Sequence, residues 1–408
     1  MSKWREVRFK DVVQFNPRVK LDRNKMYPQI GISDIDESKF NVYESKSLKY
    51  IGQSSSKFES GDILFSRITP CLENRKIARV FLKNSDRGFG STELFVFRGK
   101  KNETLTGFVS YLAQTDMIVL PAINSMTGAS GRQRADKSFI EKLKIRIPDL
   151  KTQEKIADIL LTYDELIENN NRRIEILEKT AEEIYKEWFV RMRFPGHENT
   201  RFEKGIPEGW EEVKLEDICN LVRGISYSTK EIEKDLGTAM LTLKSVNAYG
   251  GYNYDGLRFY DGKISNRHYI KKNDLIMAIT DMTQDRRVIG QVCLVPRLYY
   301  GELVFSADLI LLDDLKIEKS YMYSLLRYGG ISRYISTFSN GANVLHLNQR
   351  TLNNIRFYIA PEKLRIDYDK IHVDIQGKIN NLQLQNQNLA KQRDLLLPRL
   401  MNGTVEVK

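Results

Sequence analysis

The sequence predicts an α+β fold: two similar mixed α/β domains separated by two long antiparallel coiled-coil helices, in a pseudo-two-fold, nearly circular arrangement. The sequence contains an internal repeat of two similar halves, and each half ends in a long heptad pattern. The recurring residues are Gly128-Ala129 and Pro148 against Gly341-Ala342 and Pro361 (341 − 128 = 213, 361 − 148 = 213), and Trp4, Val7 and Asp11 against Trp210, Val213 and Asp217. Solenoid units span only about 20–50 residues, so this repeat is a duplicated domain together with its helix.

The first domain is expected over residues 1–150, where short apolar runs predict strands. Its expected elements are strands at 61–66 and 93–97, a helix at 108–114, a loop of small residues at 125–132, and a short amphipathic turn at 139–147 that leads into a strand closed by Pro148.

A central helix is expected over residues 151–192, because apolar residues keep an a/d heptad register through about five heptads. The register residues are Ile156, Leu160, Tyr163, Ile167, Ile174, Leu177, Ala181, Ile184 and Trp188, and Asn170 fills the one gap. Some 35–40 helical residues make a rod roughly 55 Å long. Pro195-Gly196 follows, so we expect the helix to end near Met192.

The second copy repeats this order. The expected segments are a linker at 193–209, a second domain at 210–361 with strands at 275–279 and 309–312, a distal helix at 362–402, and a C-terminal tail at 403–408. In the distal helix an apolar residue recurs every seven positions, at Ile375, Leu382, Leu389 and Leu396.

An apolar seam on so long a helix must be covered, and the other copy in the same chain is the nearest partner. The residues expected to pair the helices are Ile167, Ile174, Leu177, Ile184, Trp188, Ile375, Leu382, Leu389 and Leu396. Polar seam positions, expected at Asn170, Gln385 and Gln392, would fix the register. Antiparallel pairing returns the tail after Met401 to the neighbourhood of Trp4. The alternative is two separate amphipathic helices, each packed on its own domain.

The charge balance favours a polyanionic partner. Lys and Arg number 64 against 53 Asp and Glu, which gives a net charge of +11 and a pI near 9.2. Nucleic acid is the commonest partner of such a surface, although a merely soluble basic protein has the same balance. No stretch approaches the roughly 20 apolar residues of a membrane span, so we expect a soluble cytoplasmic protein without a membrane partner.

Catalytic and metal-binding motifs are missing from the sequence. The three cysteines and four histidines are scattered, so no zinc spacing is present. The phosphate-binding Gly-x-x-x-x-Gly-Lys-Ser/Thr and the nucleophile elbow Gly-x-Ser-x-Gly do not occur. Asn16-Pro17-Arg18 lacks the second proline and the aromatic residue of an amino-methyltransferase tetrapeptide. We therefore expect a non-catalytic chain with no metal and no cofactor of its own.

Loops rich in residues that bind phosphates and base edges follow the expected strands in both copies. The candidates in the first copy are Arg67, Thr69, Arg75, Lys76, Arg87, Ser91, Arg132, Gln133 and Arg134. Those in the second are Arg223, Ser226, Tyr227, Lys244, Thr280, Arg286, Arg287, Asn343, His346, Asn348 and Arg350. The alternative is that these are ordinary polar loops of a basic protein.

The whole pattern resembles the specificity subunit of type I restriction-modification systems. The similarity lies in the two half-repeats that open with Trp-x-x-Val, in the stretch from Asn169 to Val190 followed by Arg193-Phe-Pro-Gly-His-Glu198, in Ile206-Pro-Glu-Gly-Trp210, and in the helix end from Arg393 to Met401. It covers nearly the whole chain.

The resemblance implies a specificity subunit that binds double-stranded DNA through two target-recognition domains, each reading one half of a split site. Paired helices would set the gap and dock two methyltransferase subunits, and optionally two motor-nuclease subunits. S-adenosylmethionine, ATP and Mg²⁺ would sit on those partners, which methylate adenine at N6. Exposed helix residues such as Glu175, Lys179, Glu183 and Lys186 would face methyltransferase helices.

Two other interpretations stay open at this stage. The chain could be a self-contained DNA methyltransferase or nuclease with a cryptic centre, which cofactor binding by the isolated chain would reveal. It could also be a coiled-coil scaffold for proteins or RNA, which DNA-independent function would reveal.

Overall fold

The structure, a computed structural model, describes residues 4–37, 39–233, 237–298 and 301–407. Residues 1–3 of the predicted first domain and residue 408 of the predicted tail lie outside this range. The chain forms two compact units, which we call unit 1 (Met1–Asn170 with Gln385–Lys408) and unit 2 (Asn171–Leu384). Each of the two long helices therefore contributes residues to both units.

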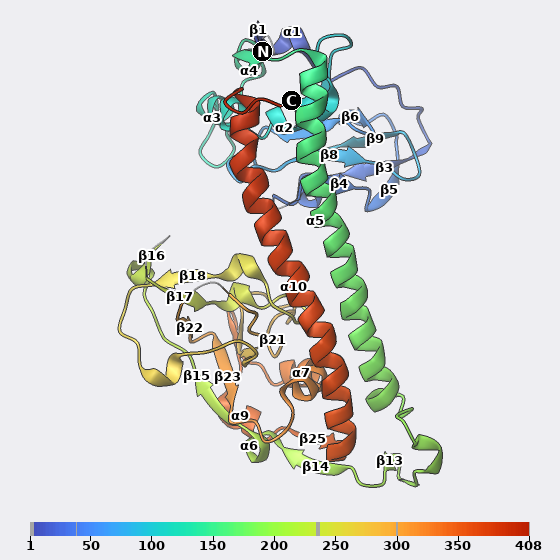
Figure 1. The fold of residues 1–408 in the computed structure, drawn as a ribbon, viewed down its shortest axis with the longest axis vertical. Helices are drawn as coiled ribbons and strands as arrows, with labels where there is room; N and C mark the ends of the chain where they lie inside the picture. The colour runs from blue at the N-terminus through green and yellow to red at the C-terminus, as the bar shows by residue number, and fades with distance from the viewer. Residues whose placement is uncertain (1–3, 38, 234–236, 299–300, 408) are drawn as a thin grey trace. The chain divides into compact units, whose positions relative to one another are not determined.

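Unit 1 combines short strands with short helices and one end of each long helix (Figure 1). Its elements are β1 Arg5–Arg8, α1 Phe9–Val12, β2 Val13–Phe15, β3 Met26–Ile30, β4 Asn41–Tyr43, β5 Lys46–Lys49, β6 Ser56–Glu59, β7 Ile63–Ser66, β8 Ile77–Phe81, β9 Arg87–Gly90, β10 Leu94–Gly99, α2 Thr106–Leu112, α3 Asp116–Asn124, α4 Lys137–Glu141, β11 Lys144–Ile147 and the start of α5 Leu150–Tyr185.

The strands of unit 1 form a five-stranded sheet in the order β2-β10-β7-β8-β4, a four-stranded sheet in the order β5-β3-β9-β6, and the pair β1-β11. Most neighbours are antiparallel, but β3 pairs with β9, and β4 with β8, in parallel. All four residues of β7 are buried, as expected for a central strand covered on both faces. Phe65, Phe95 and Phe97 join Phe108 of α2 in the main core of the unit.

Unit 2 has the same kinds of element. They are β12 Phe202–Glu203, β13 Ile206–Pro207, β14 Glu211–Lys214, α6 Leu215–Ile218, β15 Asn220–Arg223, β16 Ile232–Glu233, β17 Thr238–Leu241, β18 Arg258–Tyr260, β19 Leu275–Ala278, β20 Thr280–Asp281, β21 Val292–Leu294, β22 Leu303–Phe305, β23 Leu309–Asp313, α7 Lys319–Tyr328, α8 Ile331–Ser336, β24 Leu345–His346, α9 Gln349–Asn353, β25 Arg356–Ile359 and the start of α10 Glu362–Met401.

The topology of unit 2 repeats that of unit 1. The sheet β15-β23-β19-β21 corresponds to β2-β10-β7-β8, and β16-β18-β17-β22 again contains one parallel pair, β17 with β22. The pair β14-β25 matches β1-β11, with Glu211 opposite Ile359 where Arg5 lies opposite Ile147. The predicted duplication of a mixed α/β domain is confirmed.

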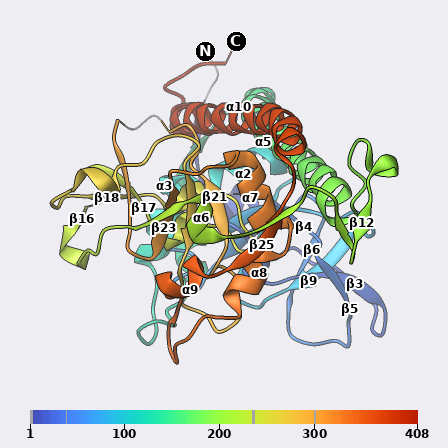
Figure 2. The ribbon, with the colours of Figure 1, turned by 90° about the horizontal axis from the view of Figure 1, so that it is seen from below.

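In unit 1, α5 and α10 lie side by side (Figures 1 and 2) and run in opposite directions, as Figure 1 shows. Arg393 of α10 forms an ion pair with Asp164 of α5, and the Asp164 carboxylate also accepts a hydrogen bond of 2.6 Å from the Tyr111 hydroxyl. Further along, Asn170 Nδ2 donates to Asn386 Oδ1 at 2.9 Å. Residue numbers rise along α5 while they fall along α10, so the predicted antiparallel pairing is present.

In unit 2, the same two helices pair through apolar residues. Ala181, Ile375 and Ile379 are buried together, and Ile174, Leu177, Ile184 and Ile371 pack around them. Beyond this point Tyr185, Trp188 and Phe189 contact Tyr368 of α10 at ring-centroid distances of 5.3–6.2 Å. A π-helical turn, η2 Lys186–Val190, ends the helix.

The structure places the remaining predicted seam residues as follows: Leu382 is buried, Ile167, Leu389 and Leu396 are half-buried, and Leu396 packs on the core of unit 1. The prediction of Gln385 and Gln392 as polar seam positions is wrong, because both are exposed. Their neighbours Asn386 and Arg393 face α5 instead. Gln385 and Gln392 follow Leu382 and Leu389 by three residues, as an a/d heptad pattern requires, but the residues four positions on, Asn386 and Arg393, are the ones that contact α5.

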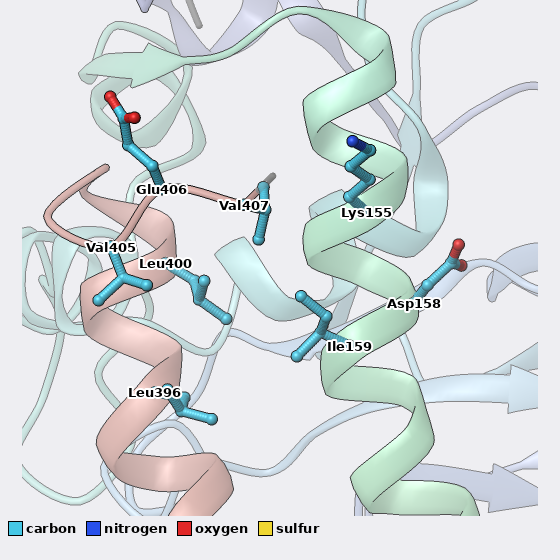
Figure 3. Close-up of a pocket in the computed structure, with 8 residues that line it drawn as sticks. All are labelled: Lys155, Asp158, Ile159, Leu396, Leu400, Val405, Glu406 and Val407. Carbon is cyan, nitrogen blue, oxygen red and sulfur yellow. The ribbon is translucent and has the colours of Figure 1, made fainter. Parts of the chain in front are cut away.

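The end of α10 closes onto the start of the chain. Leu400 and Met401 are buried in the core of unit 1, and the Gly403 backbone lies against the indole of Trp4, as the nearly circular arrangement predicted. Between this tail and α5 lies a surface pocket of about 580 Å³ (Figure 3). It has an apolar floor that includes Ile159, Leu396 and Leu400.

A buried histidine gives unit 2 a predicted pH dependence. His372 is 2% exposed, and burial, reinforced by the Arg327 charge, lowers its pKa from 6.5 to about 4. The unfolded chain therefore binds more protons than the folded chain between these pKa values. The stability that neutral His372 contributes should be fully present well above pH 6.5. The free energy of unfolding should fall by about 2 kcal/mol from pH 8 to pH 5, as measured by urea unfolding.

His372→Phe should remove most of this pH dependence, because phenylalanine does not bind a proton. The substitution should be tolerated, because the His372 ring packs against the rings of Tyr323 and Tyr368. The matched control His346→Phe alters an exposed histidine and should leave it intact. An unchanged pH slope in His372→Phe would contradict the assignment.

Candidate nucleic-acid interface

Both units hold their candidate loops on the same backbone framework. In unit 1, Arg67 N donates to Glu93 O at 3.0 Å, and Ala135 N donates to Arg67 O at 2.8 Å. In unit 2, Ile279 N donates to Asp308 O and Leu347 N to Ile279 O, each at 2.9 Å. The offset is the same at both ends (279 − 67 = 212, 347 − 135 = 212). In each unit, three segments therefore meet at one edge of the sheet. They are the segment after β7 or β19, the segment before β10 or β23, and a third loop that ends at residue 135 or 347.

The third loop is closed in the same way in each unit. Arg134 forms isolated β-bridges with Ile68 and Thr127, while His346 pairs with Thr280 and bridges to Asn340. Asp136 and Asn348 then cap the helices that follow, by accepting from backbone N–H groups. Since these contacts are made by main chain and caps, the side chains at the loop tips can differ between the units.

In unit 1, one arginine is held by a carboxylate and a second stacks on an aromatic ring. Both Glu93 oxygens accept from Arg134 at 2.6–3.0 Å, and this hydrogen bonding lowers the pKa of Glu93. The Arg67 guanidinium stacks over the Phe95 ring at 4.7 Å. Thr69 is buried, and its hydroxyl accepts from Gln133 N at 3.1 Å. Arg132, at the tip, is exposed.

In unit 2, the position of Glu93 is taken by Asp308 and that of Arg134 by His346. Thr280 is 1% exposed and donates to the Asp308 carboxylate at 3.1 Å, so it supports the loops from beneath. His346 and Asn343 are exposed. The two units thus present different side chains on one framework.

Asp281 fixes the longest loop of this edge. Its carboxylate accepts from Thr283 N and Oγ1 and from Val288 N, each at 2.9 Å, and from Ile289 N at 3.3 Å. Burial alone would raise its pKa, but these donors lower it below the usual value. Every residue between 282 and 287 is exposed, and Gln284 Nε2 bonds Ala342 O at 3.0 Å.

Several candidates are tied to other parts of the protein. In unit 1, Lys76 Nζ donates to Ile35 O at 2.9 Å and Arg75 pairs with Asp116. Arg87, at the start of β9 and far from Ser91, pairs with Glu59. In unit 2, Arg223 Nε donates to Ala307 O at 3.1 Å, and Arg287 pairs with Asp285 at 2.5 Å. Ser91 is half-buried and its hydroxyl accepts from Glu93 N at 3.2 Å. Ser226, Tyr227, Lys244, Arg286, Asn348 and Arg350 are exposed.

Sequence reasoning gave no loop-holding role to the three carboxylates, Glu93, Asp308 and Asp281, that hold the loops. Acidic residues were passed over because DNA contacts are sought among basic ones. It also missed the exposed Tyr249 and Met282. Only the repeat could have flagged Glu93 and Asp308, since each directly precedes the matching strand, β10 or β23.

The described residues contain no group of three or more His, Cys, Asp or Glu side chains placed to hold a metal. Burial raises the pKa of the Cys219 and Cys293 thiols to about 12, which makes them poor nucleophiles. Within the part of the chain that the structure describes, no helix is long and apolar enough to cross a membrane.

Two duplicated modules that present basic and amide-bearing loops define a DNA-recognition protein with two binding modules. The profile of the type I restriction modification DNA specificity domain matches residues 1–179 and 207–392. The type I restriction enzyme MjaIX specificity subunit of Methanocaldococcus jannaschii is 27% identical over 76% of this chain and 71% of its own length. The HindI specificity subunit of Haemophilus influenzae is 23% identical over 99% of this chain and all of its own.

A solved structure shares the fold. The crystal structure of the type I restriction-modification system S subunit from M. genitalium superposes with a TM-score of 0.54, at 15% identity, over 98% of this chain and 96% of that one. The chain belongs to the type I restriction-modification DNA specificity family, and acts as a specificity subunit. Such subunits are non-catalytic, bind DNA and assemble with other subunits of their system.

Asp281→Ala should loosen the loop that the carboxylate holds. Removing it leaves Val288 N and Ile289 N without their acceptor, which should cost about 1–3 kcal/mol of unfolding free energy. Trypsin should then cleave faster after Arg286 and Arg287, as followed by mass spectrometry. Asp261→Ala, at an exposed carboxylate of unit 2 outside this loop, is the control. Equal cleavage rates in wild type and Asp281→Ala would show that Asp281 does not hold the loop.

Proposed function

We propose that each unit reads one half of a split DNA target through its edge loops, while the antiparallel pair of α5 and α10 sets the distance between the halves and docks methyltransferase subunits. The observation that carries the proposal is the loop framework repeated at an offset of 212 residues with different side chains at its tips. Repeated scaffolding supports the same kind of ligand at both sites, and different tips support different sequences.

The exposed tip residues suggest which bases are read. Arg132 of unit 1 carries a guanidinium, which binds the O6 and N7 edge of guanine best. Asn343 of unit 2 carries an amide, which suits adenine N6 and N7. Arg134 is already paired with Glu93, so its role is to contact phosphate and brace the loop.

The outer faces of the helices support the docking role. Ile176 of α5 is 66% exposed and lies between the expected docking residues Glu175 and Lys179. Val373 and Leu395 of α10 are 52% and 53% exposed. Apolar side chains on a helix that already has its seam covered suit a further helix from a partner.

The remaining chemistry belongs to partners in this proposal. Two methyltransferase subunits would hold S-adenosylmethionine and methylate adenine at N6. Two motor-nuclease subunits, where a system has them, would use ATP and Mg²⁺. This chain would supply recognition of the target sequence and no catalytic group.

Half-site assignment can be tested by selecting duplexes from a random pool with the assembled methyltransferase complex. Arg132→Ala should relax one position in one half of the selected motif, and Asn343→Ala one position in the other half. Each loss should cost about 1–3 kcal/mol of discrimination. Arg146→Ala, at an exposed arginine of β11 outside the loops, should leave the motif unchanged. A single half altered by both variants would refute the assignment.

The spacing role can be tested by shortening both helices together. Asn170 faces Asn386, so residues 171–177 of α5 lie opposite 379–385 of α10. Deleting both heptads keeps the flanking pairs in register and removes about 10.5 Å of rod, or roughly three base pairs of gap. Duplicating both heptads should lengthen the gap equally. Selected motifs with unchanged half-sites and an unchanged gap would contradict the proposal.

A further inference from the structure

The two most exposed large hydrophobic residues among those described lie on neighbouring loops of unit 2. Met282 is 74% exposed and Tyr249 is 70% exposed. Tyr249 N donates to Arg287 O at 3.0 Å, which joins the loop of Tyr249 to the loop that begins at Met282. Single exposed apolar residues are common on protein surfaces, but two at this exposure on adjoining loops need an explanation.

The backbone holds Tyr249 in an unusual conformation. Its φ is +67°, in the left-handed region that bulky residues rarely adopt, and Gly250 and Gly251 follow at +93° each. Both glycines lie so close to the Arg327 side chain that an added Cβ would come within 3.1–3.4 Å of it. Strain of this kind persists where the surroundings enforce it, and it marks candidate functional positions.

Both loops are braced from below. Arg327 is itself packed against the rings of Tyr323 and Tyr328, at 5.6 and 5.1 Å. The Met282 loop hangs on the Asp281 carboxylate, and Gln284 ties it to the Ala342 carbonyl beside Asn343. The two apolar tips are therefore presented on a rigid base rather than on free chain.

The charges around the tips select the partner. Arg286 and Arg287 are exposed in the same loop as Met282, with Arg287 ion-paired to the exposed Asp285, and His346 and Asn343 belong to the loop bonded to it. Apolar side chains flanked by arginines at a DNA-reading edge match the wedges that unstack a base step while cations hold the adjoining phosphates. In unit 1 the residue that matches Met282 is Pro70 (282 − 212 = 70), which is exposed but shorter than a methionine. The cations that follow it are engaged elsewhere, because Arg75 pairs with Asp116 and Lys76 donates to a main-chain carbonyl.

We propose that Met282 and Tyr249 form an apolar wedge that inserts into duplex DNA and unstacks one base step at the half-site read by unit 2. The inference rests on the proposed DNA-reading role of these loops. It adds that unit 2 deforms its half-site while unit 1 does not. Sequence preference at that step then comes from how easily the step unstacks, without a hydrogen bond to its bases.

The test uses the full chain assembled with its methyltransferase partner and duplexes carrying its selected motif. A 2-aminopurine is placed at successive positions other than the methylated adenine, since that adenine changes its stacking for another reason. Wild type should raise the fluorescence at one step in a single half-site. Met282→Ser with Tyr249→Asn should abolish that rise and weaken binding roughly tenfold, while the half-site hydrogen-bonded positions stay the same. Asparagine is chosen because it tolerates positive φ.

Met26→Ser, at a methionine that is 60% exposed on β3 of unit 1, is the matched control and should behave as wild type. Met282→Ser alone serves if the double variant does not fold, and should reduce the rise. Specific binding without a fluorescence rise at any step would overturn the wedge and leave the proposed function standing. A rise that survives in the variants, or a loss of partner assembly in place of DNA deformation, would also overturn it. No sequence-specific binding by the wild-type complex would overturn the proposed function itself.

Discussion

The apolar seams of α5 and α10 are the constraint on which the rest of the structure depends. Neither long helix could leave such a seam in water, and each covers the seam of the other. The pairing is apolar around Ala181, Ile375 and Ile379, and polar at Asp164 with Arg393 and at Asn170 with Asn386. Apolar contacts tolerate sliding, whereas a buried ion pair and an amide pair are satisfied in one register only. The polar pairs therefore define which residues of the two helices face each other, and with that the layout of each unit.

The loops at the sheet edge of each unit show how a duplicated domain can keep its fold while its binding residues change. The contacts that close the loops are main-chain hydrogen bonds, helix caps and buried acceptors such as Asp281, none of which depends on the tip residues. Glu93 and Asp308 occupy equivalent places but bind different partners, Arg134 in one unit and Thr280 in the other. A framework of this kind leaves the side chains at the loop tips free to differ between the two units.

The sequence predicted what is periodic. The duplication, the two long helices and their antiparallel pairing followed from heptads and a constant offset, because buried faces of regular elements repeat. The sequence prediction failed where the heptad pattern and the real helix differ by one residue. Gln385 and Gln392 were assigned to the seam, whereas Asn386 and Arg393 contact α5. Among the candidate DNA contacts, Thr69 and Thr280 proved to be buried supports, and the Lys76 ammonium is bonded to main-chain carbonyls. The exposed Tyr249 and Met282 carried no signal in the sequence, since their exposure comes from loop contacts distant along the chain.

The central claim is that this chain addresses a split DNA target and leaves the chemistry to its partners. The most direct measurement is to co-express it with the methyltransferase subunit of its own system in a host that lacks both, and to map N6-methyladenine in the host DNA by single-molecule sequencing. The account predicts a new bipartite motif with a fixed gap that appears only when this chain is present. An assembled complex that produces no chain-dependent methylation, or one that marks a single uninterrupted sequence, would contradict it.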